Sequence, residues 1–385
     1  MTRSEVFQQH GTFEAIGHDM IPEKQNSLTT MSAVGEMPEA DGHISQAAGE
    51  PRTAESVVLG FLVYTTVASL ELPISTRECL TIIFLNALTT SLIFLLARVT
   101  PEKPRSFLGA VRDWLPALLI LLAYRESGMF FTPDPAHRLD RVFVRWDSFL
   151  LQNKWVVATL SGLAPWPQCY LELAYLFCYP IVPLGLGCLL LRPHRSGRQA
   201  KADSLRFAQR RLSLHCASNR MTATPQCRPD RSKGSAFQSK TQDFKSRIVV
   251  DHFWTAVLIA TMFCYAVYPF FPLTPPRLLF HDLPGPPVAP FLRMANLWLL
   301  GTYGVQACIF PSGHVAAVTA TALVVRAYRP RFGALFILAA ASVAAASVFL
   351  RYHYTADALA GALLGWAAAR ASRSCLAATT NVSER

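Results

Sequence analysis

The sequence predicts an all-α protein, a polytopic transmembrane helix bundle with about six to eight membrane spans. Of its 385 residues, 51% are hydrophobic and 16% are charged, whereas about a quarter of the residues in a soluble domain are charged. The mean hydropathy is +0.27. The formal net charge is +11, but the basic residues lie between apolar blocks rather than on one polar face. They are therefore expected to flank a membrane, and no nucleic-acid partner is expected.

Eight apolar segments are candidate spans, because a spanning helix needs about 17 to 25 mostly apolar residues. The first and the last segment are short. In chain order the candidates are 57–72, 79–97, 114–131, 169–191, 248–271, 312–328, 332–350 and 356–369. The basic and aromatic stretch 138–147 is typical of a helix that lies along the membrane interface instead of crossing it.

The remaining segments complete the predicted domain organisation. Residues 1–56 contain no sustained apolar run, so we expect a disordered cytoplasmic N-terminus without a secretory signal peptide. N-terminal membrane helices over 57–191 and a basic, disordered cytoplasmic loop over 192–247 are expected next. A second membrane region over 248–370 and a cytoplasmic tail over 371–385 follow.

The cysteines give no pattern of a cross-linked or metal-binding protein. There are nine, an odd number, and no two form a Cys-x-x-Cys pair. A disulfide framework and a zinc site are therefore not expected. Most of the cysteines fall inside apolar segments, where a free cysteine behaves as a small buried hydrophobic residue.

The segment Pro311-Ser312-Gly313-His314 precedes an apolar run and has the composition of a helix start. Free backbone N–H groups at such a start bind phosphate oxygens, and glycine lets the backbone approach the ligand closely. Ser312 and Gly313 are thus candidate phosphate-binding residues, and His314 follows in the same turn. The alternative is an ordinary helix cap with a histidine at the membrane interface.

His353 and Asp357 are spaced i, i+4, which on a helix places both side chains on one face. A carboxylate there fixes the tautomer of the imidazole and leaves the other ring nitrogen free to attack phosphorus. The alternative is a simple interfacial ion pair. Arg351 is either a phosphate clamp or an interfacial anchor.

Arg277 ends a Pro-Pro-Arg sequence that cannot continue the preceding helix. A stiff turn that directs a guanidinium at a phosphate is one interpretation, since arginine binds phosphate oxygens through two N–H groups. A plain turn that ends the helix is the other.

Charge places these clusters on one side of the membrane. Residues 192–247 hold fourteen Lys and Arg against three acidic residues, so the positive-inside rule makes that loop cytoplasmic. Counting spans from it puts the basic residues near 98–112, 326–331 and 370–373 on the same side. Arg277, His314 and His353 then all lie on the other side. We expect a multi-pass protein of the cell (inner) membrane with its site on the extracytoplasmic, periplasmic face.

These motifs resemble those of the type 2 phosphatidic acid phosphatase (PAP2) superfamily, which also contains the vanadium haloperoxidases. Its second signature has Pro-Ser-Gly-His, matched at Pro311 to His314, and its third ends in His-x-x-x-Asp, matched at His353 and Asp357. The resemblance implies a PAP2-like core in which His353 forms a phosphohistidine, Asp357 orients it and His314 protonates the leaving group. It implies no metal requirement, and no cofactor is expected. The haloperoxidases are soluble, so the hydropathy argues against that activity.

Two positions depart from the family signatures. The first signature has a lysine seven residues before Arg-Pro, whereas position 270 is Phe and the prolines here precede Arg277. The third has an arginine six residues before its histidine, where this chain has Ser347. The Pro-Pro turn and the Arg-Tyr-His-Tyr-Thr segment resemble the branch of inositol-phosphorylceramide synthases and their bacterial relatives. That branch transfers phosphoryl head groups between lipids and also hydrolyses phosphoesters.

The leading hypothesis is a membrane phosphatase or phosphotransferase for a phosphorylated lipid, with Arg277, Arg351, Ser312 and Gly313 binding the phosphate. Glu172 and Tyr175, near the outer end of the fourth candidate span, are candidate supporting residues, since an acidic residue in a membrane helix is a functional candidate by default. One alternative is a transporter whose path is lined by the histidines and Glu172. Another is a non-catalytic scaffold that uses the loop 192–247 to bind anionic lipid or a cytoplasmic partner.

Overall fold

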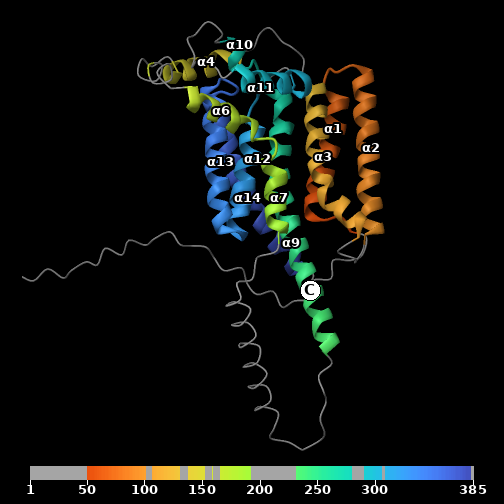
Figure 1. Cartoon of the computed structure of the whole chain (residues 1–385). Coiled ribbons are helices and arrows are strands. Elements are labelled where there is room, and N and C mark those ends of the chain that lie inside the picture. The colour runs from red at the N-terminus through yellow and green to blue at the C-terminus, as the bar shows by residue number, and fades with distance from the viewer. Residues whose placement is uncertain are drawn as a thin grey trace, which may run out of the picture. The chain divides into compact units, whose positions relative to one another are not determined.

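The computed structural model describes residues 50–100, 106–130, 138–151, 158, 165–191, 231–279, 290–305 and 308–382. Over these residues the chain is an α-helical bundle (Figure 1), so the predicted all-α class is confirmed. The β-structure of this part of the chain is one antiparallel pair of two-residue strands, with Leu273 opposite Cys308. The N-terminal disorder predicted over 1–49 and the basic stretch 192–230 lie outside the described residues.

The helices follow the predicted spans closely, with several ends displaced. In chain order the elements are α1 (Thr53–Glu71), α2 (Thr76–Val99), α3 (Phe107–Met129), α4 (Arg138–Leu151), α6 (Pro165–Leu176), α7 (Ile181–Leu190), α9 (Arg231–Val267), the 3-10 helix η1 (Tyr268–Phe270), β1 (Pro272–Leu273), α10 (Pro276–Leu279), α11 (Pro290–Tyr303), β2 (Cys308–Ile309), α12 (Gly313–Tyr328), α13 (Pro330–Phe349) and α14 (Thr355–Val382). The segment 231–247, expected within a disordered loop, is instead the helical beginning of α9. Likewise, residues 53–56 belong to α1 and not to the disordered N-terminus.

Among the described residues, five helices are long and apolar enough to cross a membrane: α1, α2, α3, α13 and the part of α9 with η1 at Arg247–Phe270. The pair α6 and α7 makes a sixth if it is counted as one span, but its two halves are bent by 69°. This corrects the single span predicted over 169–191. Pro180 stands at the break, where it lacks an N–H to donate and its ring clashes with the preceding turn. The shorter α12 and the long α14 stand in the same bundle (Figure 1).

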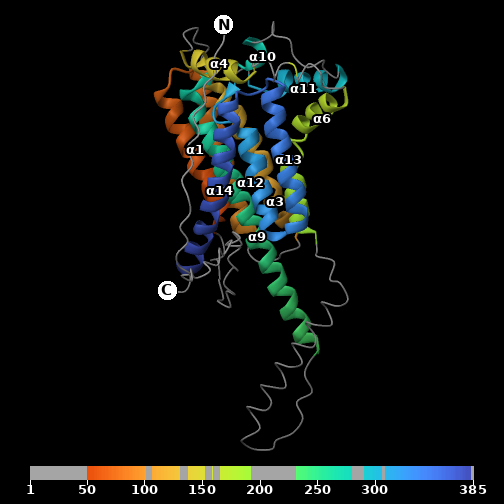
Figure 2. The same ribbon diagram turned by 90° about the vertical axis from the view of Figure 1, so that its left-hand side faces the viewer.

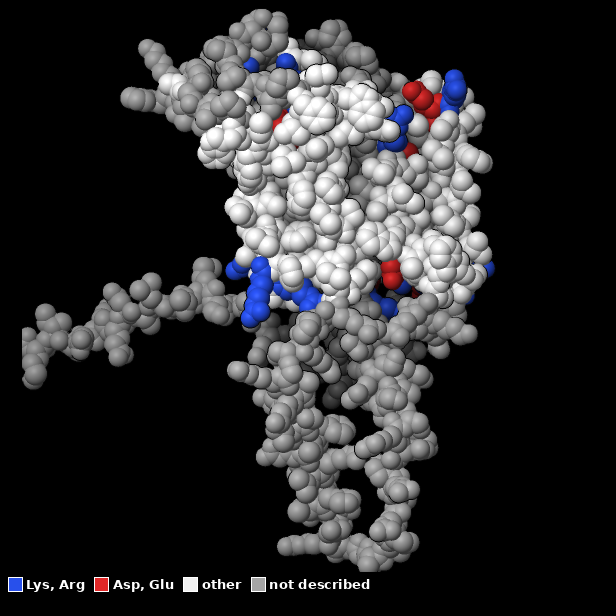
Figure 3. Space-filling model, viewed as in Figure 1, with Lys and Arg blue, Asp and Glu red and all other residues white. Residues whose placement is uncertain are grey.

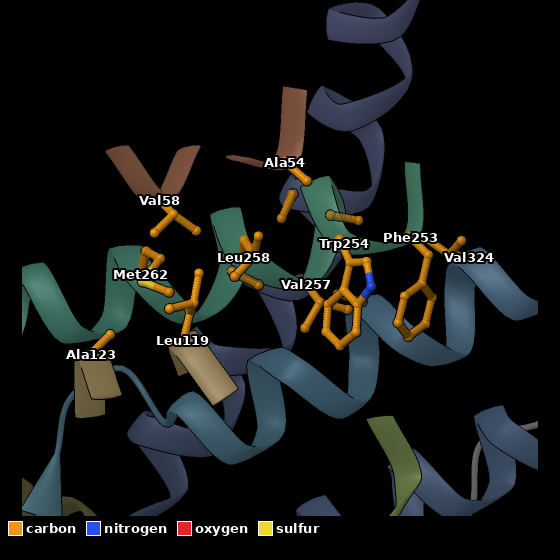
Figure 4. Close-up of a cluster of buried hydrophobic side chains, with 14 of the residues drawn as sticks. Ala54, Val58, Leu119, Ala123, Phe253, Trp254, Val257, Leu258, Met262 and Val324 are labelled. Atoms are coloured by element: carbon orange, nitrogen blue, oxygen red, sulfur yellow. The ribbon is translucent and has the colours of Figure 1, made fainter. Parts of the chain in front are cut away.

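The apolar part of α9 forms the centre of the bundle, since it packs against α1, α3, α12 and α14. Its side chains from Phe253 to Met262 are almost fully buried, except that of Ile259, which is partly buried. Figure 4 shows them in one cluster with residues from three neighbouring helices, Ala54, Val58, Leu119, Ala123 and Val324. Within the N-terminal helices, Asn86 of α2 donates to the Thr65 hydroxyl of α1 at 2.9 Å, a polar contact of the kind that holds helices together in lipid.

One end of the bundle is held by ion pairs. Arg112 of α3 donates to both carboxylate oxygens of Glu55 in α1, each at 2.6 Å, and Asp251 of α9 accepts from the backbone N–H of Ala54 at 2.9 Å. Near the same end, Nδ1 of His252 in α9 and the hydroxyl of Tyr328 in α12 form a hydrogen bond of 2.8 Å. In the face shown in Figure 3 the charged residues lie towards its two ends and the middle is uncharged, as expected of a protein that spans a membrane.

The opposite end of the bundle is covered by short elements. The helices α4, α10 and α11 lie there, across the ends of the long helices (Figures 1 and 2). The interface helix predicted at 138–147 corresponds to α4. Its exposed residues include Val142, Trp146 and Phe149, whereas Asp140, Phe143 and Asp147 are buried. This end contains the N-terminus of α12, the C-terminus of α13 and the N-terminus of α14.

Two glycines bring α14 into close contact with α12. A Cβ atom added to Gly361 would lie 2.5 Å from the carbonyl oxygen of Ser312, and one added to Gly365 would lie 2.5 Å from that of Ala316. Small residues at i, i+4 allow two membrane helices to approach this closely. The contact therefore sets the distance between the start of α12 and the start of α14.

We predict that Gly361→Ala destabilises the protein by about 1–3 kcal/mol, because the added methyl overpacks a backbone contact. The matched control is Gly60→Ala on α1, where a Cβ would meet nothing within 4 Å, so that stability stays unchanged or rises. Thermal unfolding of both variants in the same detergent measures the difference. Equal midpoints for the two would show that the helices are not held by this contact.

Candidate active site

The backbone of His353 is held by the end of α13. That helix closes with a Schellman motif, in which the N–H of Tyr352 donates to the carbonyl of Ser347 at 2.9 Å and the N–H of Arg351 to that of Val348 at 3.0 Å. The N–H of His353 also donates to the Ser347 carbonyl, at 2.9 Å. Arg351 occupies the left-handed position of this motif with φ 62°, where glycine is the usual residue.

The next residues form the N-terminus of α14, and two carboxylates cap it. Oδ2 of Asp357 accepts from the backbone N–H of Tyr354 at 3.2 Å, the reverse half of a capping box. Asp147 of α4 accepts from the N–H of Thr355 at 3.1 Å. Burial raises the pKa of Asp147, and the Thr355 N–H opposes that shift.

His353 and Asp357 lie close together, but not because they share one face of a helix. The i, i+4 spacing predicts one helix face, but α14 begins at Thr355 and His353 precedes it. The pair is adjacent because Asp357 turns back towards the helix start. Nδ1 of His353 lies 3.6 Å from Oδ2 of Asp357, the distance of an ion pair rather than of a hydrogen bond. Both residues are buried.

Cys308 of β2 fills the position beside this pair. Its thiol donates to Oδ2 of Asp357 at 3.0 Å, and the sulfur lies 3.4 Å from Nδ1 of His353. Burial and then the charge of Asp357 raise the pKa of the thiol well above its usual value, whereas the charge of Arg277 lowers it. Cys308 is thus more than the small buried hydrophobic residue that the sequence predicts, because it links the carboxylate to the imidazole.

The segment Pro311 to His314 forms the start of α12, as predicted. Ser312 is the N-cap, and its hydroxyl accepts from the N–H of Val315 at 3.4 Å. Its own N–H donates to the backbone carbonyl of Asp357 at 3.1 Å, which joins the two helix starts. The ring of His314 then meets that of His353 edge-on, with centroids 5.7 Å apart.

The two predicted phosphate-binding arginines are Arg277, which lies near Cys308, and Arg351, which precedes His353 by two residues. Arg277, half-buried at the start of α10, is close enough to Cys308 for its charge to affect the thiol. Arg351 directly follows the C-cap residue of α13. Burial lowers the pKa of Arg351, and the neighbouring charge of Arg293 lowers it further.

Glu172 and Tyr175 of α6 occupy the other side of His314. The Tyr175 ring lies 6.0 Å from the His314 ring and stacks on Tyr352, with centroids 3.8 Å apart and planes at 15°. Glu172, fully buried, accepts from the Tyr352 hydroxyl at 2.8 Å, from the Asn296 amide at 2.7 Å and from Arg293 at 3.3 Å. The guanidinium of Arg293 also covers the free face of the Tyr352 ring at 4.6 Å.

Four residues around the histidines are not site candidates in the sequence interpretation: Cys308, Asp147, Arg293 and Asn296. None of them belongs to a motif. Cys308 comes shortly before His314 in the chain, and the other three come from α4 and α11. The clearest available signal is the acidic residues of the amphipathic stretch 138–147, because a buried carboxylate at the interface needs a partner. As for metals, Cys308, His353 and Asp357 carry ligand atoms that all lie within 4.8 Å of one another.

A comparison with known proteins found a family that matches part of the chain. Residues 244–371 match the family model of the PAP2 superfamily. This region runs from α9 to α14 and contains Arg277, Cys308, both histidines and Asp357. No curated protein and no solved structure matches the chain.

We predict that Glu172→Ala destabilises the protein by about 3–5 kcal/mol, because Arg293 loses its buried carboxylate partner. Glu71→Ala, at the exposed end of α1, is the matched control and should change the free energy of unfolding by less than about 0.5 kcal/mol. Denaturant unfolding in mixed micelles measures both. A loss no larger than that of the control would show that Glu172 does not hold this network.

Proposed function

We propose that the protein is an integral-membrane, metal-independent lipid phosphatase or phosphotransferase that acts through a phosphohistidine intermediate at the outer face of the membrane. The observation that carries this proposal is the contact of two imidazoles, His314 and His353, from separate helix starts, with a carboxylate beside one of them. The match to the PAP2 superfamily over the same residues supports a phosphatase-type activity.

In the first step, Nε2 of His353 attacks phosphorus, since Nδ1 faces Asp357 and the Cys308 thiol. A P–N bond forms and the P–O bond to the leaving group breaks. His314 donates a proton to the departing oxygen. The two rings touch edge-on, so no space remains between them. The phosphoryl group therefore lies beside both rings, within reach of one nitrogen of each ring.

The positive and polar groups around the rings hold the phosphate oxygens. Arg277 and Arg351 supply guanidinium groups, and Ser312 supplies its hydroxyl. Gly313 lies at the helix start of α12, whose free N–H groups favour an anion. The first signature's lysine is absent, and Arg351 takes the place of the arginine that the third signature has at position 347. Electrostatic stabilisation of this kind acts most strongly in a buried site.

In the second step, a hydroxyl attacks phosphorus and the P–N bond breaks, while His314 takes the proton of the incoming hydroxyl. Water gives hydrolysis, and an alcohol gives transfer, as in the inositol-phosphorylceramide-synthase branch. The orientation of the basic bundle end supports the extracytoplasmic placement of the site.

A phospholipid substrate fits the surroundings of the site. Its neighbours α6 and α11 expose large apolar side chains, among them Trp166 at 73%, Phe291 at 79% and Trp298 at 61%. Aromatic residues at this level anchor a protein at the membrane interface. A lipid can present its phosphate there while its chains stay in the bilayer.

The first test incubates the purified protein in chelator with a panel of lipid phosphates and diphosphates, with and without inositol or glycerol. Free phosphate identifies a phosphatase, and a new phosphodiester lipid identifies a transferase. We expect His353→Ala and Asp357→Asn to abolish turnover in a protein that remains folded and inserted. Wild-type turnover in either variant, or neither product from the wild type, would refute the proposal.

The second test separates the two interpretations of Arg351. Arg351→Gly relieves the left-handed backbone and should stabilise the protein by up to about 1 kcal/mol. If the guanidinium binds phosphate, the same variant loses turnover by about tenfold or more, as expected when one charge-stabilising group is removed. Arg351→Lys is the control that keeps a charge. A stabilised variant with full turnover would make Arg351 an interfacial anchor.

A further inference from the structure

We propose that Cys308, His353 and Asp357 form a binding site for Zn²⁺, and that occupation of this site reversibly inhibits the enzyme. The inhibition rests on the proposed function, because the same histidine is its nucleophile. Binding of the ion does not rest on it.

The three ligand atoms already form a triangle of suitable size. Sγ lies 3.0 Å from Oδ2 and 3.4 Å from Nδ1, and Nδ1 lies 3.6 Å from Oδ2. A tetrahedral zinc ion with bonds of about 2.0–2.3 Å separates such ligands by about 3.4–3.6 Å. Two sides of the triangle therefore fit, and the sulfur–oxygen side must open by about half an ångström. Coordination replaces the S–H···O hydrogen bond that draws these two atoms together, so this side is free to open.

The donor set is the one that zinc prefers. Thiolate, imidazole and carboxylate are its usual ligands in proteins, and three protein ligands leave a fourth position for water or a phosphate oxygen. Oδ1 of Asp357 is buried and has no hydrogen-bond partner among the described residues, so the carboxylate retains an unused lone pair beside the site. Two hydrogen bonds hold two of the ligands in place: the N–H of His353 donates to the Ser347 carbonyl, and the N–H of Tyr354 donates to the Asp357 carboxylate.

Binding exchanges one proton for the ion. In the free protein the thiol carries a proton, which it donates to Oδ2 of Asp357. Coordination requires the thiolate, so the proton leaves to water as the Zn–S bond forms. His353 contributes the lone pair of Nδ1, and Asp357 contributes one of Oδ2.

Inhibition follows from the tautomer of His353. A neutral imidazole carries one N–H, and coordination through Nδ1 uses the lone pair of that nitrogen. The proton must then stand on Nε2, the nitrogen that attacks phosphorus in the proposed mechanism. Zinc thus removes the nucleophile without occupying the position of the phosphate.

The first measurement follows turnover against free Zn²⁺ in a metal buffer, each variant relative to its own rate in chelator. Cys308→Ser keeps an O–H donor for Asp357 but loses the sulfur ligand. We expect its half-inhibiting zinc concentration to rise about tenfold or more, since even loss of a residue that only supports a ligand weakens zinc binding by about that factor. Cys188→Ser, a buried thiol of α7 away from these residues, should match the wild type, and chelator should restore turnover. Equal inhibition of Cys308→Ser and the wild type would overturn the proposal.

The second measurement needs no catalysis. Co²⁺ replaces zinc as an optical probe, and the wild type should show the thiolate-to-cobalt absorption of a four-coordinate site. The band should be lost in Cys308→Ser and weakened in Asp357→Asn, and it should persist in Cys188→Ser. A band that survives in Cys308→Ser rejects the site. A band that depends on Cys308 in a protein without activity towards any lipid phosphate supports the metal site and refutes only the proposed function.

Discussion

The close approach of α14 to α12 is the contact on which the rest of the site depends. In lipid the hydrophobic effect gives helices no net attraction, so their spacing depends on how closely the backbones can pack. Gly361 and Gly365 let α14 touch the carbonyls at the start of α12, and the N–H of Ser312 then reaches the carbonyl of Asp357. Through this contact the two helix starts become one unit. His314 lies in the first turn of α12 and His353 lies just before α14, so the contact keeps the two residues close to each other.

The catalytic candidates stand at helix ends, where backbone groups are free to hold them. His353 lies between the Schellman end of α13 and the capped start of α14, so its position is fixed by hydrogen bonds of the backbone. A residue held in this way loses little further freedom when a substrate binds. The left-handed conformation of Arg351 costs free energy, and arginine stands here at a position where glycine is usual.

Side chains from three further elements complete the surroundings of the histidines. Asp147 of the interface helix α4 caps α14, and Glu172 of the bent α6 holds Tyr352 and Arg293. Cys308 of β2 lies beside Asp357 and His353 and contacts both side chains. The proposed reaction and the proposed metal site use the same imidazole, because each needs a lone pair of His353.

The sequence by itself determined the helical class, the candidate spans and the helix start at Pro311 to His314. Hydropathy and capping act over a few neighbouring residues, so these features are local. Even there, the bend at Pro180 and the helical start of α9 differ from the prediction, since a window of average hydropathy registers neither a break nor a polar helix. Only the tertiary structure decided that Cys308 contacts His353, that Asp147 and Arg293 contact the residues on either side of it, and that His353 lies outside the helix of Asp357. Those relations arise from packing between distant segments, which the spacing of residues along the chain does not encode.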